Sequence, residues 1–253
     1  MTFEELKKLL SFSESASTEA RWILSEKLSD SDIYKIIERR KSGEPLSKIL
    51  THRGFWKGDF IIDKNVLDPR PDSETLIQAV LDEFPDKTQP LRILDLGTGS
   101  GCLLISLLME YPHATGVGVD ISEKALSIAR KNALKNNVKA EFILADIGKL
   151  PQNLGPFDIV ISNPPYIPTK DIKNLDECVK KYDPHLALDG GVDGLDFYRF
   201  IAQTAPASFV FLEIGQGQEK DVQNIFEQKN WEFLASKKDY AGITRVLIFK
   251  KDL

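Results

Sequence analysis

Short apolar runs rich in β-branched residues alternate with helical patterns from Leu91 onward, and this alternation constrains the fold more than any other feature of the sequence. The runs cover Arg92 to Leu96, Thr115 to Asp120, Glu141 to Ala145, Phe157 to Ser162 and Phe209 to Ile214. The helical patterns between them cover Gly101 to Tyr111, Ser122 to Asn136 and Leu195 to Ala205. Strands that alternate with helices form a parallel sheet covered on both faces. The sequence therefore predicts an α/β fold.

The C-terminal part continues this pattern with a helix near Gln216 to Gln228 and two further runs, Trp231 to Ser236 and Thr244 to Phe249. Strands joined by a short connection pair as antiparallel neighbours, because a parallel pair needs a long crossover. We therefore expect an antiparallel pair at the end of the sheet.

The N-terminal part has a different pattern, in which apolar residues recur at helical spacing. Thr2 and Glu5 have the spacing of a capping box, and apolar stripes of three helices follow. The stripes are Phe3, Leu6 and Leu10, then Ala20, Ile23, Leu24 and Leu28, and then Ile33, Ile36 and Ile37. We expect a small helical domain at 1–45, a hairpin linker at 46–75 with its turn at Lys57-Gly58-Asp59, and a large α/β domain at 76–253.

Composition excludes several classes of protein. The chain has 253 residues and a net charge of -5, so it can bury a sizeable core but has no overall excess of positive charge for tracking nucleic-acid phosphates. The longest apolar run, Cys102 to Met109, is too short to span a bilayer, so we expect a cytoplasmic protein without a membrane anchor. Neither the two cysteines nor the three histidines have the spacing of a metal site.

A glycine-rich loop, Gly97-Thr98-Gly99-Ser100-Gly101, follows the first strand of the α/β part. Glycines at this place let the backbone turn sharply and approach a ligand at the start of the next helix. A dinucleotide fingerprint would have its last glycine at position 102, which is Cys102. The loop alone is equally compatible with a tight turn that binds nothing.

Acidic residues stand at the ends of the first three strands of this part, and they make the loop more informative. Asp95 ends the first strand, Asp120 occupies the place where an acid binds ribose hydroxyls, and Asp146 follows the third strand, where it can accept a bond from an amino group such as that of adenine. Three carboxylates suit a cationic sulfonium and do not suit a pyrophosphate. The set predicts S-adenosylmethionine as the cofactor, and the alternative is that these residues are helix caps.

The tetrad Asn163-Pro164-Pro165-Tyr166 follows the fourth strand and predicts the chemistry. Two prolines remove two backbone donors and hold the Pro164 carbonyl rigidly. This carbonyl and the Asn163 side chain can accept both hydrogens of a substrate NH₂ group, while Tyr166 packs on its plane. The first and fourth strands flank the switch point of such a sheet, so the tetrad should lie beside the glycine loop. The alternative is a proline-rich turn that begins at Asn163.

These motifs together resemble the HemK/PrmC-type release factor glutamine methyltransferases, a family of class I methyltransferases. The resemblance runs from about Gly43 to the C-terminus. It rests on Gly43-Glu44-Pro45-Leu46, Phe55-Trp56, Pro69-Arg70-Pro71-Asp72-Ser73-Glu74, Asp95 to Gly101, Asp120, Asn163 to Tyr166 and Leu212-Glu213-Ile214-Gly215. The tetrad is shared with methyltransferases that act on adenine and cytosine amino groups, so the segment Arg70 to Glu74 carries the narrower assignment.

The resemblance implies a Rossmann-like, mostly parallel seven-stranded sheet with a reversed last strand, and an N-terminal helical domain that helps to hold a protein substrate. It implies methyl transfer from S-adenosylmethionine to the glutamine amide nitrogen in the Gly-Gly-Gln motif of peptide chain release factors. The expected cofactor residues are Gly97, Thr98, Gly99, Ser100, Gly101, Asp120, Asp146, Ile147 and Asn163. The expected catalytic and substrate residues are Asn163, Pro164, Pro165 and Tyr166, with Arg70 at the substrate.

Two other functions are compatible with parts of this pattern. A nucleic-acid amino-methyltransferase would use the same tetrad on a flipped base, but it would normally need a basic groove or a recognition domain, and the sequence indicates neither. A noncatalytic sensor of the cofactor would have no need of a double amide acceptor. We therefore expect release factors as partners and no direct contact with nucleic acid.

Overall fold

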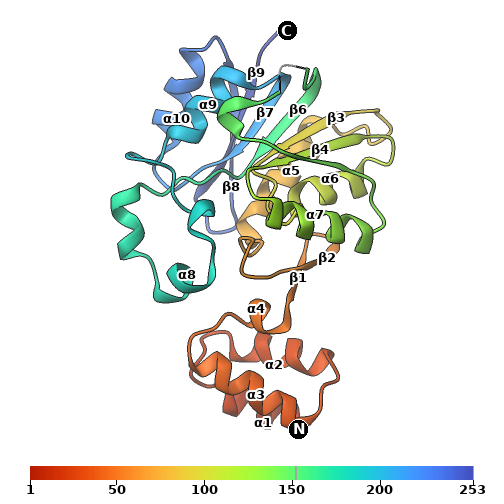
Figure 1. Cartoon of the computed structure of the whole chain (residues 1–253), viewed down its shortest axis with the longest axis vertical. Coiled ribbons are helices and arrows are strands. Elements are labelled where there is room, and N and C mark those ends of the chain that lie inside the picture. Colours follow the sequence, from red (N-terminus) through yellow and green to blue (C-terminus); the bar gives the residue numbers. More distant parts are fainter. Residues whose placement is uncertain (152, 253) are drawn as a thin grey trace.

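A mostly parallel sheet between two layers of helices forms the larger part of the protein, and a group of short helices lies beside it (Figure 1). The computed structural model describes residues 1–151 and 153–252, and over these residues the main sheet is seven-stranded. Its strands are β3 (Arg92–Leu96), β4 (Thr115–Asp120), β5 (Glu141–Leu144), β6 (Phe157–Ser162), β7 (Ala207–Glu213), β8 (Glu232–Lys238) and β9 (Thr244–Lys250). The expected α/β fold is confirmed.

The strand order is β5-β4-β3-β6-β7-β9-β8. Strand β3 pairs in parallel with both β4 and β6. The strands that follow β3 in the chain are therefore added first on one side of it, as β4 and β5, and then on the other, beginning with β6. A crevice opens at such a switch point. Strand β9 lies antiparallel between β7 and β8, which confirms the expected antiparallel pair and the reversed last strand.

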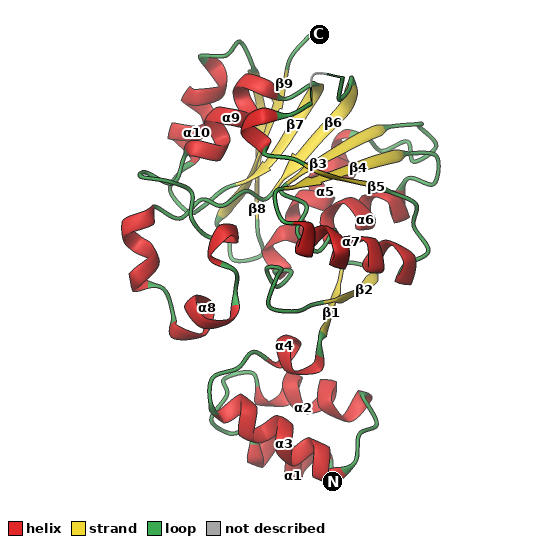
Figure 2. Cartoon of the chain, in the orientation of Figure 1, coloured by secondary structure: helices red, strands yellow, loops and turns green. Residues whose placement is uncertain are grey.

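Helices cover both faces of the sheet, as Figure 2 shows. They are α5 (Glu74–Glu83), α6 (Cys102–Glu110), α7 (Glu123–Lys135), α9 (Asp196–Thr204) and α10 (Glu219–Glu227). Neighbouring strand residues point to opposite faces, so Ile93 packs in one hydrophobic cluster with α5, α6 and α7, while Leu94 packs in the other with α9 and α10. Burial on both faces explains why the strands are continuous apolar runs.

The N-terminal helices are α1 (Phe3–Leu9), α2 (Ala16–Ser25), α3 (Asp30–Lys41) and α4 (Leu46–Leu50). The capping box of Thr2 and Glu5 is present at the start of α1. The expected stripes pack into one buried cluster, except that Leu28 lies beyond the end of α2 and is 37% exposed. Leu46 and Ile49 of α4 also pack in this cluster. Helix α4 was not expected, because it is only five residues long.

The hairpin consists of β1 (His52–Phe55) and β2 (Gly58–Ile61). Phe55 pairs with Gly58, so the turn residues are Trp56 and Lys57, and the expected turn at Lys57-Gly58-Asp59 is wrong by one residue. The cause is Trp56, a non-glycine residue with a φ of 52°, which a turn signal based on Gly58 does not predict.

The segment between β6 and α9 contains only short helices and loops, and Figure 1 places it between the sheet and the N-terminal helices. Its helices are the 3₁₀ helices η3 (Thr169–Asn174) and η4 (His185–Ala187) and the α-helix α8 (Glu177–Tyr182). Two further 3₁₀ helices, η1 (Pro71–Ser73) and η2 (Ile147–Lys149), begin near the crevice. Within the part of the chain that the structure describes, no helix has the length and apolarity to cross a membrane.

Candidate active site

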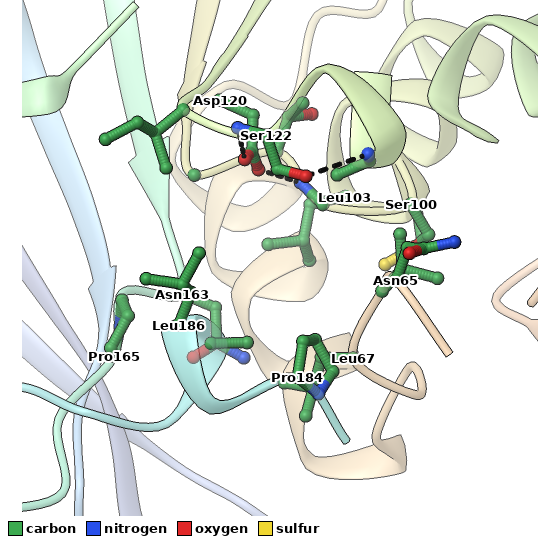
Figure 3. Close-up of a pocket in the computed structure, with 18 of the residues that line it drawn as sticks. Asn65, Leu67, Ser100, Leu103, Asp120, Ser122, Asn163, Pro165, Pro184 and Leu186 are labelled. Atoms are coloured by element: carbon green, nitrogen blue, oxygen red, sulfur yellow. Dashed lines mark hydrogen bonds between the residues drawn. The ribbon is translucent and has the colours of Figure 1, made fainter. Parts of the chain in front are cut away.

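A cavity of about 370 Å³ opens at the carboxyl ends of β3, β4 and β6 (Figure 3). Figure 3 shows Asp120 and Ser122 at one edge and Leu67 and Pro184 at the other. Residues distant in the sequence line it together, among them Asp68, Arg70, Ser73, Gly97, Thr98, Gly99, Ser100, Asp120, Asp146, Ile147, Asn163, Pro165, Phe197 and Phe200. The glycine loop, both acids and the start of the tetrad therefore meet at the switch point, as the sequence predicts.

The glycine loop is held against the end of β4. The backbone N–H groups of Gly97 and Thr98 both donate to the Val119 carbonyl, at 2.8 and 3.0 Å. Gly101 has a φ of 80° and does not line the cavity. A Cβ at Gly101 would lie 3.0 Å from the Ile105 side chain and 3.2 Å from that of Ala129, so this glycine is needed for the close packing of α6 against α7.

Asp120 lies at the end of β4 and faces the glycine loop. Its Oδ2 accepts the Gly99 N–H at 2.9 Å, and its Oδ1 accepts the Ser122 N–H at 2.9 Å. A carboxylate has about four acceptor positions, so both oxygens keep lone pairs for a ligand. Burial raises the pKa of Asp120, while the backbone hydrogen bonds lower it.

Asp146 and Ile147 form another part of the cavity wall. Asp146 Oδ1 accepts the Gly148 N–H at 2.8 Å at the start of η2. Ile147 is buried, and its side chain reaches toward Gly97. Phe197 and Phe200 of α9 add apolar surface, with their rings edge to face and their centroids 6.3 Å apart. This part of the cavity can take a flat, largely apolar group that carries a hydrogen-bond donor.

Asp95 lies behind the glycine loop and is not among the residues that line the cavity, so the expectation of three carboxylates facing the ligand is wrong for this one. Asp95 is 1% exposed, and its Oδ2 accepts the Thr98 hydroxyl at 2.6 Å. Burial raises the pKa of Asp95 to about 7. Strand β3 is buried on both faces of the sheet, so the position of Asp95 in the sequence did not predict whether its side chain faces the cavity or the core.

The tetrad begins where β6 lies beside β3. The Ser162 hydroxyl donates to the Leu96 carbonyl at 2.6 Å and ties the two strand ends together. The Asn163 Nδ2 donates to the Ser73 hydroxyl oxygen at 3.1 Å, so its Oδ1 remains available as an acceptor. Asn163 and Pro165 line the cavity, whereas Pro164 is buried and Tyr166 packs against the hydrophobic cluster beneath α9.

Arg70 lies at the cavity and is held by the segment that follows β6. Its Nη2 is 2.8 Å from Oδ2 of Asp183, and the Lys48 ammonium of α4 is 3.4 Å from the other oxygen of the same carboxylate. Asp183 therefore connects the Arg70 segment, the segment between β6 and α9, and the N-terminal helices. This connection joins the cavity wall to α4, which packs in the same buried cluster as α1, α2 and α3.

Several residues of the cavity were not singled out from the sequence. Ser73 belongs to the segment Arg70 to Glu74, but the sequence predicts no role for its side chain, which fixes the Asn163 amide. Phe197 and Phe200 supply aromatic surface and lie outside recognisable motifs of cofactor binding. Cys102 also lines the cavity, and burial raises the pKa of its thiol to about 12, so it is a poor nucleophile. Only the tertiary structure places these residues together.

The residues present fit S-adenosylmethionine. The cavity has the size of a small-molecule site. Asp120 offers free carboxylate lone pairs for ribose hydroxyls, Asp146 has an oxygen without a backbone bond for an amino group, and Ile147 supplies an apolar wall. Gly97 and Gly99 have φ values of 74° and 54°, which favour glycine, and because glycine has no side chain the approach to the loop stays open.

Comparisons with known proteins identify the family of this chain. Residues 87–230 match the family described as a methyltransferase domain. The release factor glutamine methyltransferase of Rhodospirillum rubrum is 43% identical over 221 residues, which cover 85% of this chain and 67% of that protein. The enzyme of the same name from Agrobacterium fabrum is 43% identical over 227 residues, with coverage of 87% and 78%.

Solved structures share the fold. A methyltransferase from Pyrococcus furiosus is 16% identical, covers 85% of this chain and 100% of its own, and superposes with a TM-score of 0.57. The magnesium protoporphyrin IX methyltransferase of Synechocystis, solved with bound S-adenosylmethionine, is 20% identical, with coverage of 71% and 79% and a TM-score of 0.50. The chain therefore belongs to the release factor glutamine methyltransferase family, and it is a class I methyltransferase with S-adenosylmethionine as its cofactor.

Proposed function

We propose that this enzyme methylates the side-chain amide nitrogen of the glutamine in the Gly-Gly-Gln motif of peptide chain release factors, without direct contact with nucleic acid. The observation that carries the proposal is the Asn163 amide. Its Nδ2 donates to Ser73, its Oδ1 accepts no hydrogen bond from the residues that the structure describes, and Asn163 lines the cavity, so it can present an acceptor to a substrate NH₂ group. The release factor glutamine methyltransferases that match this chain agree with that acceptor.

The cofactor is held by the loop and the two acids in this proposal. Gly97 to Ser100 would let the backbone pass close to the cofactor, Asp120 would accept from the ribose hydroxyls, and Asp146 would accept from the adenine amino group. Ile147 packs on the adenine ring. When bound, S-adenosylmethionine supplies an electrophilic methyl group on a cationic sulfur.

The tetrad orients the acceptor nitrogen. An amide nitrogen is a poor nucleophile because its lone pair is delocalised into the carbonyl. Asn163 Oδ1 and the Pro164 carbonyl accept its two hydrogens and turn the lone pair toward the methyl group, while Pro165 and Tyr166 pack on the amide plane. Orientation of this kind lowers the activation barrier by up to ~7–11 kcal/mol. As the nitrogen bonds to the methyl carbon, the bond between that carbon and sulfur would break, and the sulfur would leave as a neutral thioether. The nitrogen then becomes acidic because its lone pair is used, and its proton would leave to water or to Asn163 Oδ1.

The helical domain and Arg70 have docking roles in this proposal. Residues 1–45 and the segment between β6 and α9 both lie below the sheet in Figure 1. Pro184, Leu186 and Ala187 of that segment line the cavity. Arg70, held by Asp183, contacts the substrate loop at the cavity. A protein substrate would thus touch both domains while its glutamine enters the cavity.

The acceptor is tested with labelled S-adenosylmethionine and four substrates in parallel. These are a release factor, its variant with the Gly-Gly-Gln glutamine replaced by alanine, DNA and RNA. We expect label in the unmodified release factor alone, and mass spectrometry should place it on that glutamine. Label in DNA or RNA without label in the release factor would overturn the proposal and favour a nucleobase acceptor.

A further inference from the structure

A buried carboxyl group, that of Glu213, lies beside Asn163 but outside the cavity lining. Strands β6 and β7 are parallel, and Ser162 pairs with Leu212. Asn163, the first residue after β6, and Glu213, the last residue of β7, therefore stand side by side at the carboxyl end of these strands. Glu213 is 3% exposed.

Ser73 lies beside both side chains. It is 3% exposed at the end of η1, and its hydroxyl oxygen accepts the Asn163 Nδ2 at 3.1 Å. Ser73 and Asn163 are both close enough to Glu213 to lower the pKa of its carboxyl group by hydrogen bonding. Glu213 Oε2 has no hydrogen-bond partner among the residues that the structure describes. A buried carboxyl oxygen without a partner is costly, so such a group calls for a functional explanation.

We propose that Glu213 is a positioning residue of the methyl transfer, which acts through Ser73 to hold the Asn163 Oδ1 toward the acceptor nitrogen. This inference rests on the function proposed above. An ionised Glu213 can only accept, so it would accept a hydrogen bond from the Ser73 hydroxyl, and the Ser73 oxygen would keep a lone pair to accept from Asn163. Each hydrogen bond in such a chain polarises the next and strengthens the Asn163 oxygen as an acceptor.

A protonated Glu213 would break this order, because it could donate its own proton to the Ser73 oxygen and compete with Asn163. Burial raises the pKa of Glu213 to about 7, so the two states exchange near neutral pH. The charged or titratable groups around it are Arg245 of β9, Asp72 of η1, Tyr166 after β6, Tyr198 of α9 and Cys102 of α6. Arg245 favours the ionised state and Asp72 opposes it.

The test is the pH dependence of kcat on a release factor, from about pH 5.5 to about pH 9, for the wild type and Glu213→Gln. The wild-type kcat should rise with pH and level off above about pH 7. Glu213→Gln should have a kcat lower by about tenfold above pH 7 and no inflection near that pH. The dissociation constant for S-adenosylmethionine should stay within about twofold, because Glu213 does not line the cavity. Glu232→Gln, at an exposed position of β8, is the matched control and should retain the wild-type profile.

A Glu213→Gln enzyme with the wild-type kcat and the wild-type inflection would overturn the inference. Should that variant fail to fold, Ser73→Ala and Ser73→Thr decide the question: we expect a loss of about tenfold in kcat for alanine and recovery with threonine, which keeps the hydroxyl. Equal kcat for both would also overturn it. Failure of the proposed function gives a different result, because the wild type itself would then leave the release-factor glutamine unlabelled and label another acceptor. The pH profiles of kcat would then be compared on that acceptor.

Discussion

The backbone N–H of Gly99 donates a 2.9 Å hydrogen bond to Oδ2 of Asp120, so the glycine loop and the acid at the next strand end hold each other in place. The second oxygen of the same carboxylate is held by the Ser122 N–H at the start of α7. The carboxylate therefore has one orientation before any ligand arrives. Preorganisation of this kind lowers the ordering cost of binding.

Asp120→Ala should weaken the binding of S-adenosylmethionine by roughly 1.5–3 kcal/mol, because it removes a charged acceptor and loosens the Gly99 backbone. Isothermal titration calorimetry measures this change directly. Asp221→Ala, at an exposed position of α10, is the control and should bind as the wild type does. An unchanged dissociation constant for Asp120→Ala would remove Asp120 from the ribose site.

Asn163→Ala should lower kcat by about 10²–10³, the scale seen when one preorganised hydrogen-bonding group is removed from an active site. The cofactor should still bind, because the glycine loop and Asp120 remain intact. Single-turnover kinetics with the release factor, combined with calorimetry on the cofactor, separates the two effects. A loss confined to cofactor affinity would mean that Asn163 holds the cofactor and does not orient the acceptor.

The sequence predicted the sheet well because its central strands are buried on both faces. Runs such as Arg92 to Leu96 and Phe157 to Ser162 have no polar face to confuse with a loop, and the observed bounds of β3 and β6 are the predicted ones. The site residues at the strand ends followed from the same regularity, since parallel strands bring their carboxyl ends to one edge.

The remaining features depend on tertiary contacts that leave no periodic signal. The segment from 167 to 190 contains only short helices, and its placement rests on contacts such as the pair of Arg70 with Asp183. The environment of Asp95 and the contact of Ser73 with Asn163 also join residues that are remote in the sequence or hidden by the sheet. The sequence pattern therefore predicts which strand ends and loops form the site, but it does not predict the side chains that hold the site residues in place.

Removal of residues 1–45 should separate cofactor binding from substrate docking. This cut keeps Lys48, whose ammonium donates to the carbonyls of Asp63 and Val66 at 2.9 and 2.7 Å. We expect the truncated enzyme to bind S-adenosylmethionine and to methylate a short Gly-Gly-Gln peptide as before. Its kcat/KM on the full release factor should fall by about tenfold or more, because contacts outside the glutamine loop are lost. Unaltered turnover on the full release factor would contradict the docking role.

Glu110 should stabilise the fold at neutral pH and lose this effect in acid. Its carboxylate, at the end of α6, accepts the Trp56 indole N–H at 2.8 Å and pairs with Lys57 at 2.5 Å and with Lys87. Burial acts to raise the pKa of Glu110, but the hydrogen bonds from Lys57, Lys87 and Trp56 outweigh it and lower the pKa to about 2. A lowered pKa in the folded state means that the stabilisation is complete above the ordinary value of 4.5 and is lost as the pH falls toward 2.

Glu110→Gln should therefore reduce the free energy of unfolding at pH 7 by roughly 1.5–3 kcal/mol, the worth of hydrogen bonds to a charged group. The wild type should lose stability relative to this variant as the pH falls below about 4.5, so the difference between them shrinks in acid. Urea unfolding at a series of pH values measures it, with Glu227→Gln on the exposed side of α10 as the control. The hairpin turn contacts α6 through Trp56 and Lys57. The substitution leaves the surface exposed on unfolding unchanged, so the loss should appear as a lower transition midpoint with an unchanged m-value. A difference that stays constant from pH 7 into acid would show that the Glu110 charge does not stabilise the fold.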